Sequence, residues 1–201
     1  MKHLVILVFI SLLNVSCSLS EESDISSKKT DSGLNCYLPY SVKRDHTVAG
    51  CEVPGYHMRY DIAKKGKIFM ILLPDGADSV KNSATYFSID TFSLEGGSLQ
   101  QLFDADIKAM VNERPGIKII KNLTYQLPVK DSGACLGAEL AYPSAEFPHE
   151  IFFMCDTGSK NYAIMLSLGA RTKKAFAEAQ PIFLKWMDVP QMVKDVTIHV
   201  F

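Results

Sequence analysis

Two cysteines lie symmetrically about a turn, and their spacing constrains the fold more than any other feature of this chain. The stretch Gly133–Leu168 has the pattern of two consecutive β-hairpins, and the first turn is expected at Pro143–Pro148. Cys135 and Cys155 are equally distant from Ala145, the middle of that turn. Directly opposed cysteines of an antiparallel pair can form a bridge if the bonding geometry also allows it. The spacing therefore predicts a hairpin joined by a Cys135–Cys155 disulfide.

The hydrophobic pattern supports the same register. It pairs Leu136 with Met154 and Ala138 with Phe152 on one face of the hairpin. A slip by one residue would move every apolar side chain to the other face, so this agreement specifies the pairing. The second turn is expected at Asp156–Asn161, where Gly, Asn and Asp separate two apolar runs.

Length and charge limit the classes of function. A chain of 201 residues can form one good-sized core, and its 47% apolar and 21% charged residues are typical of a globular protein. The formal net charge is −1 and no Lys/Arg cluster is present in the sequence. Nucleic-acid binding requires a basic surface, so we expect no nucleic-acid partner.

The first residues have the pattern of a secretory signal peptide, residues 1–17. Lys2 precedes the apolar run Leu4–Leu13, and Asn14–Cys17 follows as a processing site. This resembles a bacterial lipoprotein signal, in which the cysteine becomes the lipidated first residue, although Asn14 stands where an aliphatic residue is usual. We expect lipidation at Cys17 and a protein anchored to a membrane on the periplasmic face of the bacterial cell envelope. Ordinary cleavage, giving a secreted or soluble periplasmic protein, is the alternative.

The following segment, residues 18–33, is polar, lacks aromatic residues and has no periodicity. We interpret it as a flexible tether, because it offers too little apolar surface to offset the entropy of ordering. Residues 34–201 are expected to form one globular domain.

Four cysteines remain after Cys17, and in an exported chain they suggest two disulfides with three possible connectivities. The hairpin symmetry selects Cys135–Cys155 and leaves Cys36–Cys51. Free buried thiols or a metal site are the alternatives. No C-x-x-C spacing is present in the sequence, so we expect no zinc site.

Two helices are indicated. Ser98–Gln101 has the form of a capping box, and an apolar stripe with one polar interruption, at Asp106, extends the helix over Ser98–Arg114. Thr172–Met187 has a second stripe, and Pro181 predicts a kink or a break there. Further strands are expected at Tyr56–Ile62, Lys67–Pro74, Ala84–Phe92, Ile117–Ile120 and Leu123–Val129.

The order of these elements resembles the PsbP-like fold. The resemblance rests on Gly133–Tyr142, Ile151–Leu166 and Ala179–Met187, and covers roughly Tyr56–Met187. It implies an α+β protein, an α/β/α sandwich around a mainly antiparallel sheet. The family includes bacterial envelope lipoproteins of the DcrB type, which the signal sequence also resembles, and its members are generally non-enzymatic. The cysteine pair is not part of the family pattern.

No motif in the sequence points to a cofactor or to catalysis. The histidines are scattered without metal-ligand spacing, and no nucleotide loop or nucleophile elbow is present. Asp104 and Asp106 are expected on the helix surface, and His149 and Glu150 in solvent. Cys135 and Cys155 have neither the close spacing nor the helix end of a redox pair, so we expect a structural role.

Two classes of function follow. The first is a non-catalytic envelope lipoprotein that binds another envelope protein through an open sheet edge or a loop. The alternative is a small-ligand carrier or enzyme with a pocket between sheet and helix. A deep pocket with two or more convergent titratable groups favours the alternative, and an exposed apolar patch on a filled core favours the first class.

Overall fold

The computed structural model describes residues 26–29, 35–38, 46–48, 50–66, 68–127, 133–158, 162–188 and 192–194. For 26–29, 36–38, 46–48 and 192–194 it describes the backbone alone. The predicted signal peptide, including Cys17, lies outside the described residues.

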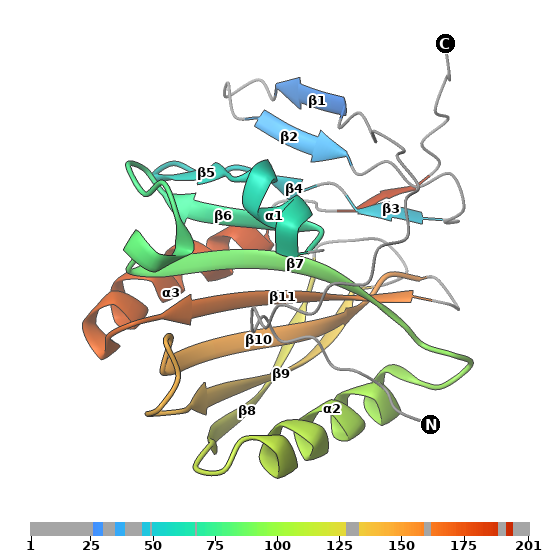
Figure 1. Ribbon diagram of the computed structural model, residues 1–201. Helices are drawn as coiled ribbons and strands as arrows, with labels where there is room; N and C mark the ends of the chain where they lie inside the picture. The colour runs from blue at the N-terminus through green and yellow to red at the C-terminus, as the bar shows by residue number, and fades with distance from the viewer. Residues whose placement is uncertain are drawn as a thin grey trace, which may run out of the picture.

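A seven-stranded sheet forms the centre of the protein, with the strand order β5-β6-β7-β11-β10-β9-β8 (Figure 1). Every neighbouring pair in it is antiparallel. The strands are β5 (Tyr56–Met58), β6 (Met70–Pro74), β7 (Thr85–Ser93), β8 (Lys118–Gln126), β9 (Ala134–Ala141), β10 (His149–Asp156) and β11 (Tyr162–Ala170). The predicted register of the first hairpin is confirmed, since Leu136 pairs with Met154 and Ala138 with Phe152.

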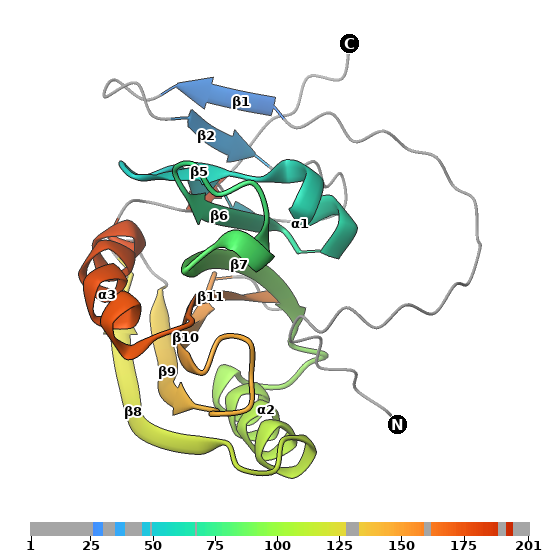
Figure 2. The same cartoon turned by 60° about the vertical axis from the view of Figure 1, so that its left-hand side comes forward.

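Helices cover both faces of the sheet. Helix α3 (Lys173–Met187) packs on one face through Phe176, Phe183 and Trp186. Helices α1 (Tyr60–Gly66) and α2 (Leu99–Glu113) pack on the other face (Figure 2). The predicted α+β sandwich with an antiparallel sheet is confirmed, because helices cover both faces and each neighbouring pair of strands is antiparallel.

The predicted helix starts are confirmed. The Ser98 side chain accepts a hydrogen bond from the backbone N–H of Gln101, and the Gln101 side chain accepts one from the N–H of Ser98. Thr172 caps α3 by accepting from the N–H of Ala175. Of the kink or break predicted at Pro181, the break is excluded, because α3 continues through this residue, and the kink stays a prediction. Proline removes one intrahelical donor, and the buried apolar stripe on either side stabilises the helix around this loss.

Two strand predictions need correction. The expected strand Tyr56–Ile62 ends at Met58, and α1 follows, with the N–H of Ala63 donating to the carbonyl of Arg59. Alternating apolar residues favoured a strand, but burial of Ala63 against β6 stabilises a helical turn. The two short strands expected after α2 form one strand, β8, with an irregular register between Ile119 and Lys121.

Short strands precede and follow the main sheet. Strands β1 (Ser26–Lys29), β2 (Asn35–Leu38) and β4 (Gly50–Cys51) form one small sheet, and β3 (His46–Val48) pairs with β12 (Met192–Lys194). The predicted tether therefore contains the four residues of β1. A 3-10 turn, η1 (Val80–Asn82), precedes β7. The indole N–H of Trp186 donates to the carbonyl of Cys51 at 2.7 Å, which joins β4 to α3.

Candidate functional site

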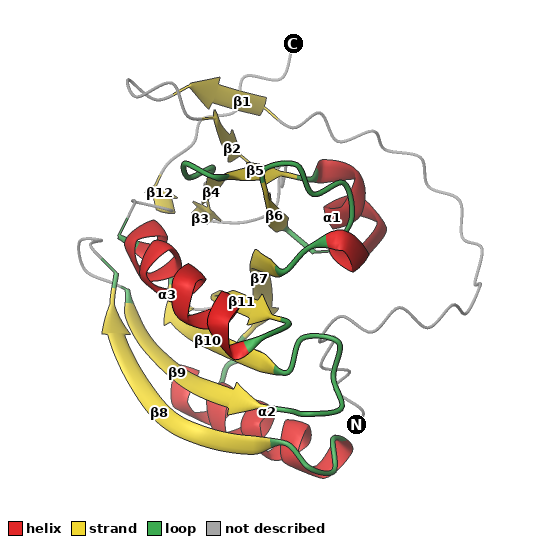
Figure 3. Cartoon of the chain, turned by 90° about the vertical axis from the view of Figure 1, so that its left-hand side faces the viewer, coloured by secondary structure: helices red, strands yellow, loops and turns green. Residues whose placement is uncertain are grey.

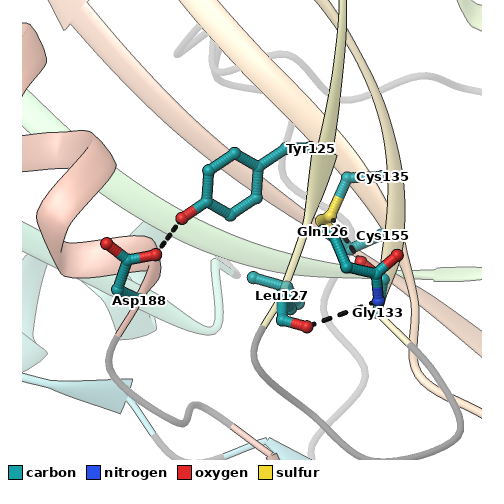
Figure 4. The surroundings of a disulfide bond; sticks show 7 residues. All are labelled: Tyr125, Gln126, Leu127, Gly133, Cys135, Cys155 and Asp188. Carbon is teal, nitrogen blue, oxygen red and sulfur yellow. Dashed lines mark hydrogen bonds between the residues drawn. A yellow bond between two sulfur atoms is a disulfide. The ribbon is translucent and has the colours of Figure 1, made fainter.

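The Cys135–Cys155 disulfide links β9 to β10, and its prediction is confirmed (Figure 4). The two Cα atoms are 4.0 Å apart, and the side chains are 3% and 0% exposed. A thiol reagent or redox partner must reach a sulfur atom to react with it. Burial within the core on the α3 side of the sheet therefore supports a structural role.

The second predicted bridge, Cys36–Cys51, stays a prediction. The β2–β4 register places Cys36 directly opposite Cys51, and Cys51 is disulfide-bonded. The side chain of Cys36 is outside the described residues.

A tyrosine joins the sheet to the end of α3 close to the disulfide. The hydroxyl of Tyr125 on β8 donates to the carboxylate of Asp188, the residue that ends α3 (Figure 4). Burial, and then the bond to this carboxylate, raise the pKa of Tyr125 to about 12. The contact holds the outermost strand against the helix.

Two carboxyl groups are buried on the α2 side of the sheet, where the sequence predicted solvated ones. Asp106 is 3% exposed, and its Oδ2 has no hydrogen-bond partner among the described residues. Glu150 is half-buried as a residue, but its Oε1 is inaccessible and likewise unpartnered. The surface prediction is confirmed for Asp104 alone, which is exposed and accepts from the Gln100 side chain at 2.8 Å.

The strand register explains the burial of Glu150. It lies opposite Leu140 on β9 and Gly169 on β11, and Gly169 lies opposite Tyr86 on β7. A Cβ on Gly169 would stand 2.3 Å from Cε1 of Tyr86, so the tyrosine ring covers the glycine. The absent side chain thus lets Tyr86 reach across β11 toward Glu150.

An arginine fixes the loops around this tyrosine. The ring of Phe147 meets Tyr86 edge-on, with centroids 4.9 Å apart, and the guanidinium of Arg171 lies 4.5 Å from the Phe147 centroid. Arg171 also donates to the Glu146 carboxylate at 2.6 Å and to the carbonyls of Val80, Lys81 and Ser83. The β9–β10 turn is thereby attached to η1, and this closes one side of the buried carboxyl region.

Desolvation dominates the electrostatics of the pair. Burial raises the pKa of Asp106 to about 6. The positive charge of Arg114 reduces this shift, and the negative charge of Glu113 increases it. Burial raises the pKa of Glu150 to about 7, again opposed by Arg114 and increased by Asp106. Burial and the charge of Glu150 also raise the pKa of Tyr86. These charge interactions act between groups of this one region, so the protonation of one group affects the pKa of the others.

Sequence reasoning missed this region, although a signal for each carboxyl existed. Asp106 interrupts the apolar stripe of α2 between Phe103 and Met110, both of which are buried. Glu150 precedes Phe152 by two residues, so it shares the core face of its strand. A polar residue that has the same spacing as the buried apolar residues of its helix or strand therefore indicates a buried polar side chain.

A cavity of about 520 Å³ lies at the start of α2, and neither Asp106 nor Glu150 lines it. Its lining residues are Leu94, Gly96, Gly97, Ser98, Leu99, Asp156 and Ala163. Among the described residues, no group of three His, Cys, Asp or Glu side chains is placed to hold a metal ion. None of the described helices is long and apolar enough to cross a membrane.

The outermost strand β8 presents an open edge. It is nine residues long and, in the described part of the chain, pairs with β9 alone (Figure 3). Ile119 and Ile120 on it are 40% and 55% exposed. Beyond the irregularity near Ile120, Lys121–Gln126 keeps a regular register with β9. The strand at the other end of the sheet, β5, has three residues.

The fold and these surfaces define an α+β sandwich with one long exposed sheet edge. No family model and no curated protein matches the sequence. Among solved structures, the chain is similar to cyanobacterial PsbP (CyanoP) from Synechocystis sp. PCC 6803, with 7% identity, a TM-score of 0.49, and coverage of 90% of this chain and 98% of that one. It is also similar to the Ran-binding protein Mog1p of Saccharomyces cerevisiae, with 11% identity, a TM-score of 0.43, and coverage of 86% and 96%. These likenesses concern the fold alone, and a DcrB-type relationship stays a prediction.

Proposed function

We propose that the protein is a non-catalytic lipoprotein of the bacterial cell envelope that binds another envelope protein along the open edge of β8. The exposed edge carries this proposal. Backbone groups at a sheet edge can pair with an extended segment of a partner, and natural proteins usually shorten or cover such edges. Here the edge runs for nine residues, and two exposed isoleucines stand beside it.

The occupant we infer is an extended segment that adds an eighth strand next to Lys121–Gln126. This stretch keeps a regular register with β9, so its free side offers evenly placed donors and acceptors. Apolar side chains of the segment would cover Ile119 and Ile120. Attachment through Cys17 would hold the protein at the membrane, where such partners reside.

Site-specific crosslinking tests the proposal. A photo-crosslinking amino acid placed at exposed Thr124 of β8 is expected to give a defined adduct in intact cells, and one at exposed Glu178 of α3 is not. Changing Ile120→Glu should abolish the adduct, whereas Ile182→Glu, which alters an exposed isoleucine of α3, should leave it unchanged. No adduct at Thr124, or equal adducts at both positions, would contradict binding at this edge.

The second class of function, an enzyme or ligand carrier, is favoured by one observation, the converging Asp106 and Glu150 carboxyls. Asp106 is buried and Glu150 is half-buried, and neither of them lines the cavity at the start of α2. A small molecule that co-purifies with the wild-type protein and is lost from Asp106→Asn would support this second class over protein binding.

A further inference from the structure

Asp106 and Glu150 come from the two layers that α2 and the sheet bring together. Asp106 is on the buried face of α2, beside Phe103 and Met110. Glu150 is on β10, in the row that leads to Phe152 and Met154, the residues on which α2 packs. Each has one inaccessible carboxyl oxygen without a hydrogen-bond partner among the described residues. Such an atom is tolerated far better in a protonated carboxyl than in a carboxylate.

The charged groups around Asp106 and Glu150 do not form an ion pair that would neutralise an ionised carboxyl in the described structure. Arg114, at the end of α2, is the basic group that acts on both carboxyls, yet no ion pair joins it to either one in the described structure. Asp90 of β7 shares this face, since it pairs with Met165, and its Oδ1 accepts from the N–H of Thr91. The described residues that face α2 from β9 and β11 are not titratable: Leu136, Ala138, Leu140, Met165, Ser167 and Gly169. Glu113 and Tyr86 also lie near the pair, and beyond Tyr86 the charged groups Arg171 and Glu146 pair with each other at 2.6 Å.

We propose that Asp106 and Glu150 form a proton-operated latch that closes helix α2 onto the sheet when both carboxyls are protonated and loosens it when they ionise. Loss of a proton from either group leaves an unpaired charge under the helix. Hydration of that charge requires water between α2 and β10, and this water separates the helix from the sheet. This latch does not depend on the proposed binding role.

The structure limits the loosening to one layer. Helix α2 contributes two buried apolar side chains, Phe103 and Met110, whereas α3 buries a larger set: Phe176, Ala179, Phe183, Trp186 and Met187. The end of α2 is also exposed at Val111, which is 47% accessible. Local opening has a low free energy where few apolar contacts are buried. Helix α3 on the opposite face is therefore an internal control.

Hydrogen exchange of the whole purified protein tests the latch. Protection factors, corrected for the intrinsic exchange rate, are measured for the amides of α2 and α3 at pH 5 and pH 8. If Asp106 alone is linked to opening, α2 protection should fall about tenfold between these values, and further if Glu150 contributes. Protection of α3 should stay constant. The double variant Asp106→Asn, Glu150→Gln should lose the pH dependence of α2, and Asp104→Asn should keep it.

Equal protection of α2 at both pH values in the wild-type protein would overturn the proposal. The proposal would also be overturned if α2 protection in the double variant fell between pH 5 and pH 8 as much as it does in the wild-type protein. If circular dichroism shows that the double variant does not fold, carbon-13 NMR titration of the wild-type side-chain carboxyls decides the matter. Two carboxyls that titrate above pH 5.5, together with the pH-dependent protection of α2, support the latch. Titration of every carboxyl near pH 4 contradicts it.

Discussion

Two glycines of the sheet lie beneath aromatic rings that cross from a neighbouring strand. A Cβ on Gly137 would stand 2.5 Å from Cδ1 of Phe153, and one on Gly169 would stand 2.3 Å from Cε1 of Tyr86. Glycine weakens a strand by itself, and a ring packed over it restores the lost contact. At Gly169 the ring also shields Glu150, so one missing side chain governs the burial of a titratable group.

Changing Gly169→Ala is expected to destabilise the protein. The new methyl group must displace Tyr86 and its edge contact with Phe147, and overpacking of this kind costs about 1–3 kcal/mol. Urea denaturation followed by the fluorescence of Trp186, the sole tryptophan, measures the loss. Gly66→Ala is the control, because the added Cβ meets only the flexible end of Ile68. Equal stability of the Gly169 variant and the wild-type protein would show that Tyr86 has room to move.

Asp106→Asn should reduce the loss of stability on raising the pH. The pKa of Asp106 is raised from 3.8 to about 6 in the folded protein, so the folded state binds the proton more tightly than the unfolded state does. The contribution of protonated Asp106 to the free energy of unfolding is fully present below pH 3.8 and is lost as the pH rises through about 6. The shift corresponds to at most about 3 kcal/mol. Denaturation at pH 4.5 and pH 8 should give a smaller difference for Asp106→Asn than for wild type or Asp104→Asn. The same difference in all three proteins would contradict this assignment.

At the scale of elements, the hairpin β9–β10 is specified several times over. The opposed cysteines, the alternation of apolar residues and the turn all give the register that the strands adopt. The start of α2 is specified as well, by reciprocal hydrogen bonds between Ser98 and Gln101. Elements with such agreement between local signals are the ones that a sequence predicts well.

Removing the hairpin disulfide by Cys135→Ala together with Cys155→Ala should cost about 3 kcal/mol, because the bond closes a loop of 20 residues in the unfolded chain. Guanidinium denaturation measures the loss. Non-reducing peptide mapping of the same variant should still find Cys36 joined to Cys51. A variant as stable as wild type would mean that the bond does not constrain the unfolded state.

At the scale of the whole molecule, the antiparallel sheet separates two cores with different roles. The α3 side contains the disulfide and most of the aromatic cluster, and the α2 side contains the unpaired carboxyls. Both sides bury apolar side chains, and we propose that protonation acts on the α2 side. The long edge of β8 borders both layers, and in the described part of the chain it is the edge at which we propose that a partner binds.

Anchoring of the whole molecule through Cys17 is tested by fractionation. Wild-type protein is expected in the membrane fraction, and Cys17→Ala in the soluble fraction, since the lipid would be its attachment to the bilayer. Ser16→Ala serves as the matched control for a small-residue change beside the site. The same distribution for Cys17→Ala and wild type would favour ordinary signal cleavage.

The sequence by itself determined the hairpin register and both helix starts, because these follow from local periodicity, capping and turn spacing, whereas the sandwich was expected from the resemblance to the PsbP-like fold. Only the tertiary structure decided the environment of Asp106 and Glu150, because burial depends on which strand lies beneath a helix and on the room left at Gly169. It also decided that α3 continues through Pro181 and that Tyr60–Gly66 is helical, since packing outweighed the local preference. The open edge of β8 was likewise outside the reach of local pattern, because the order of strands is set by contacts between residues far apart in the chain.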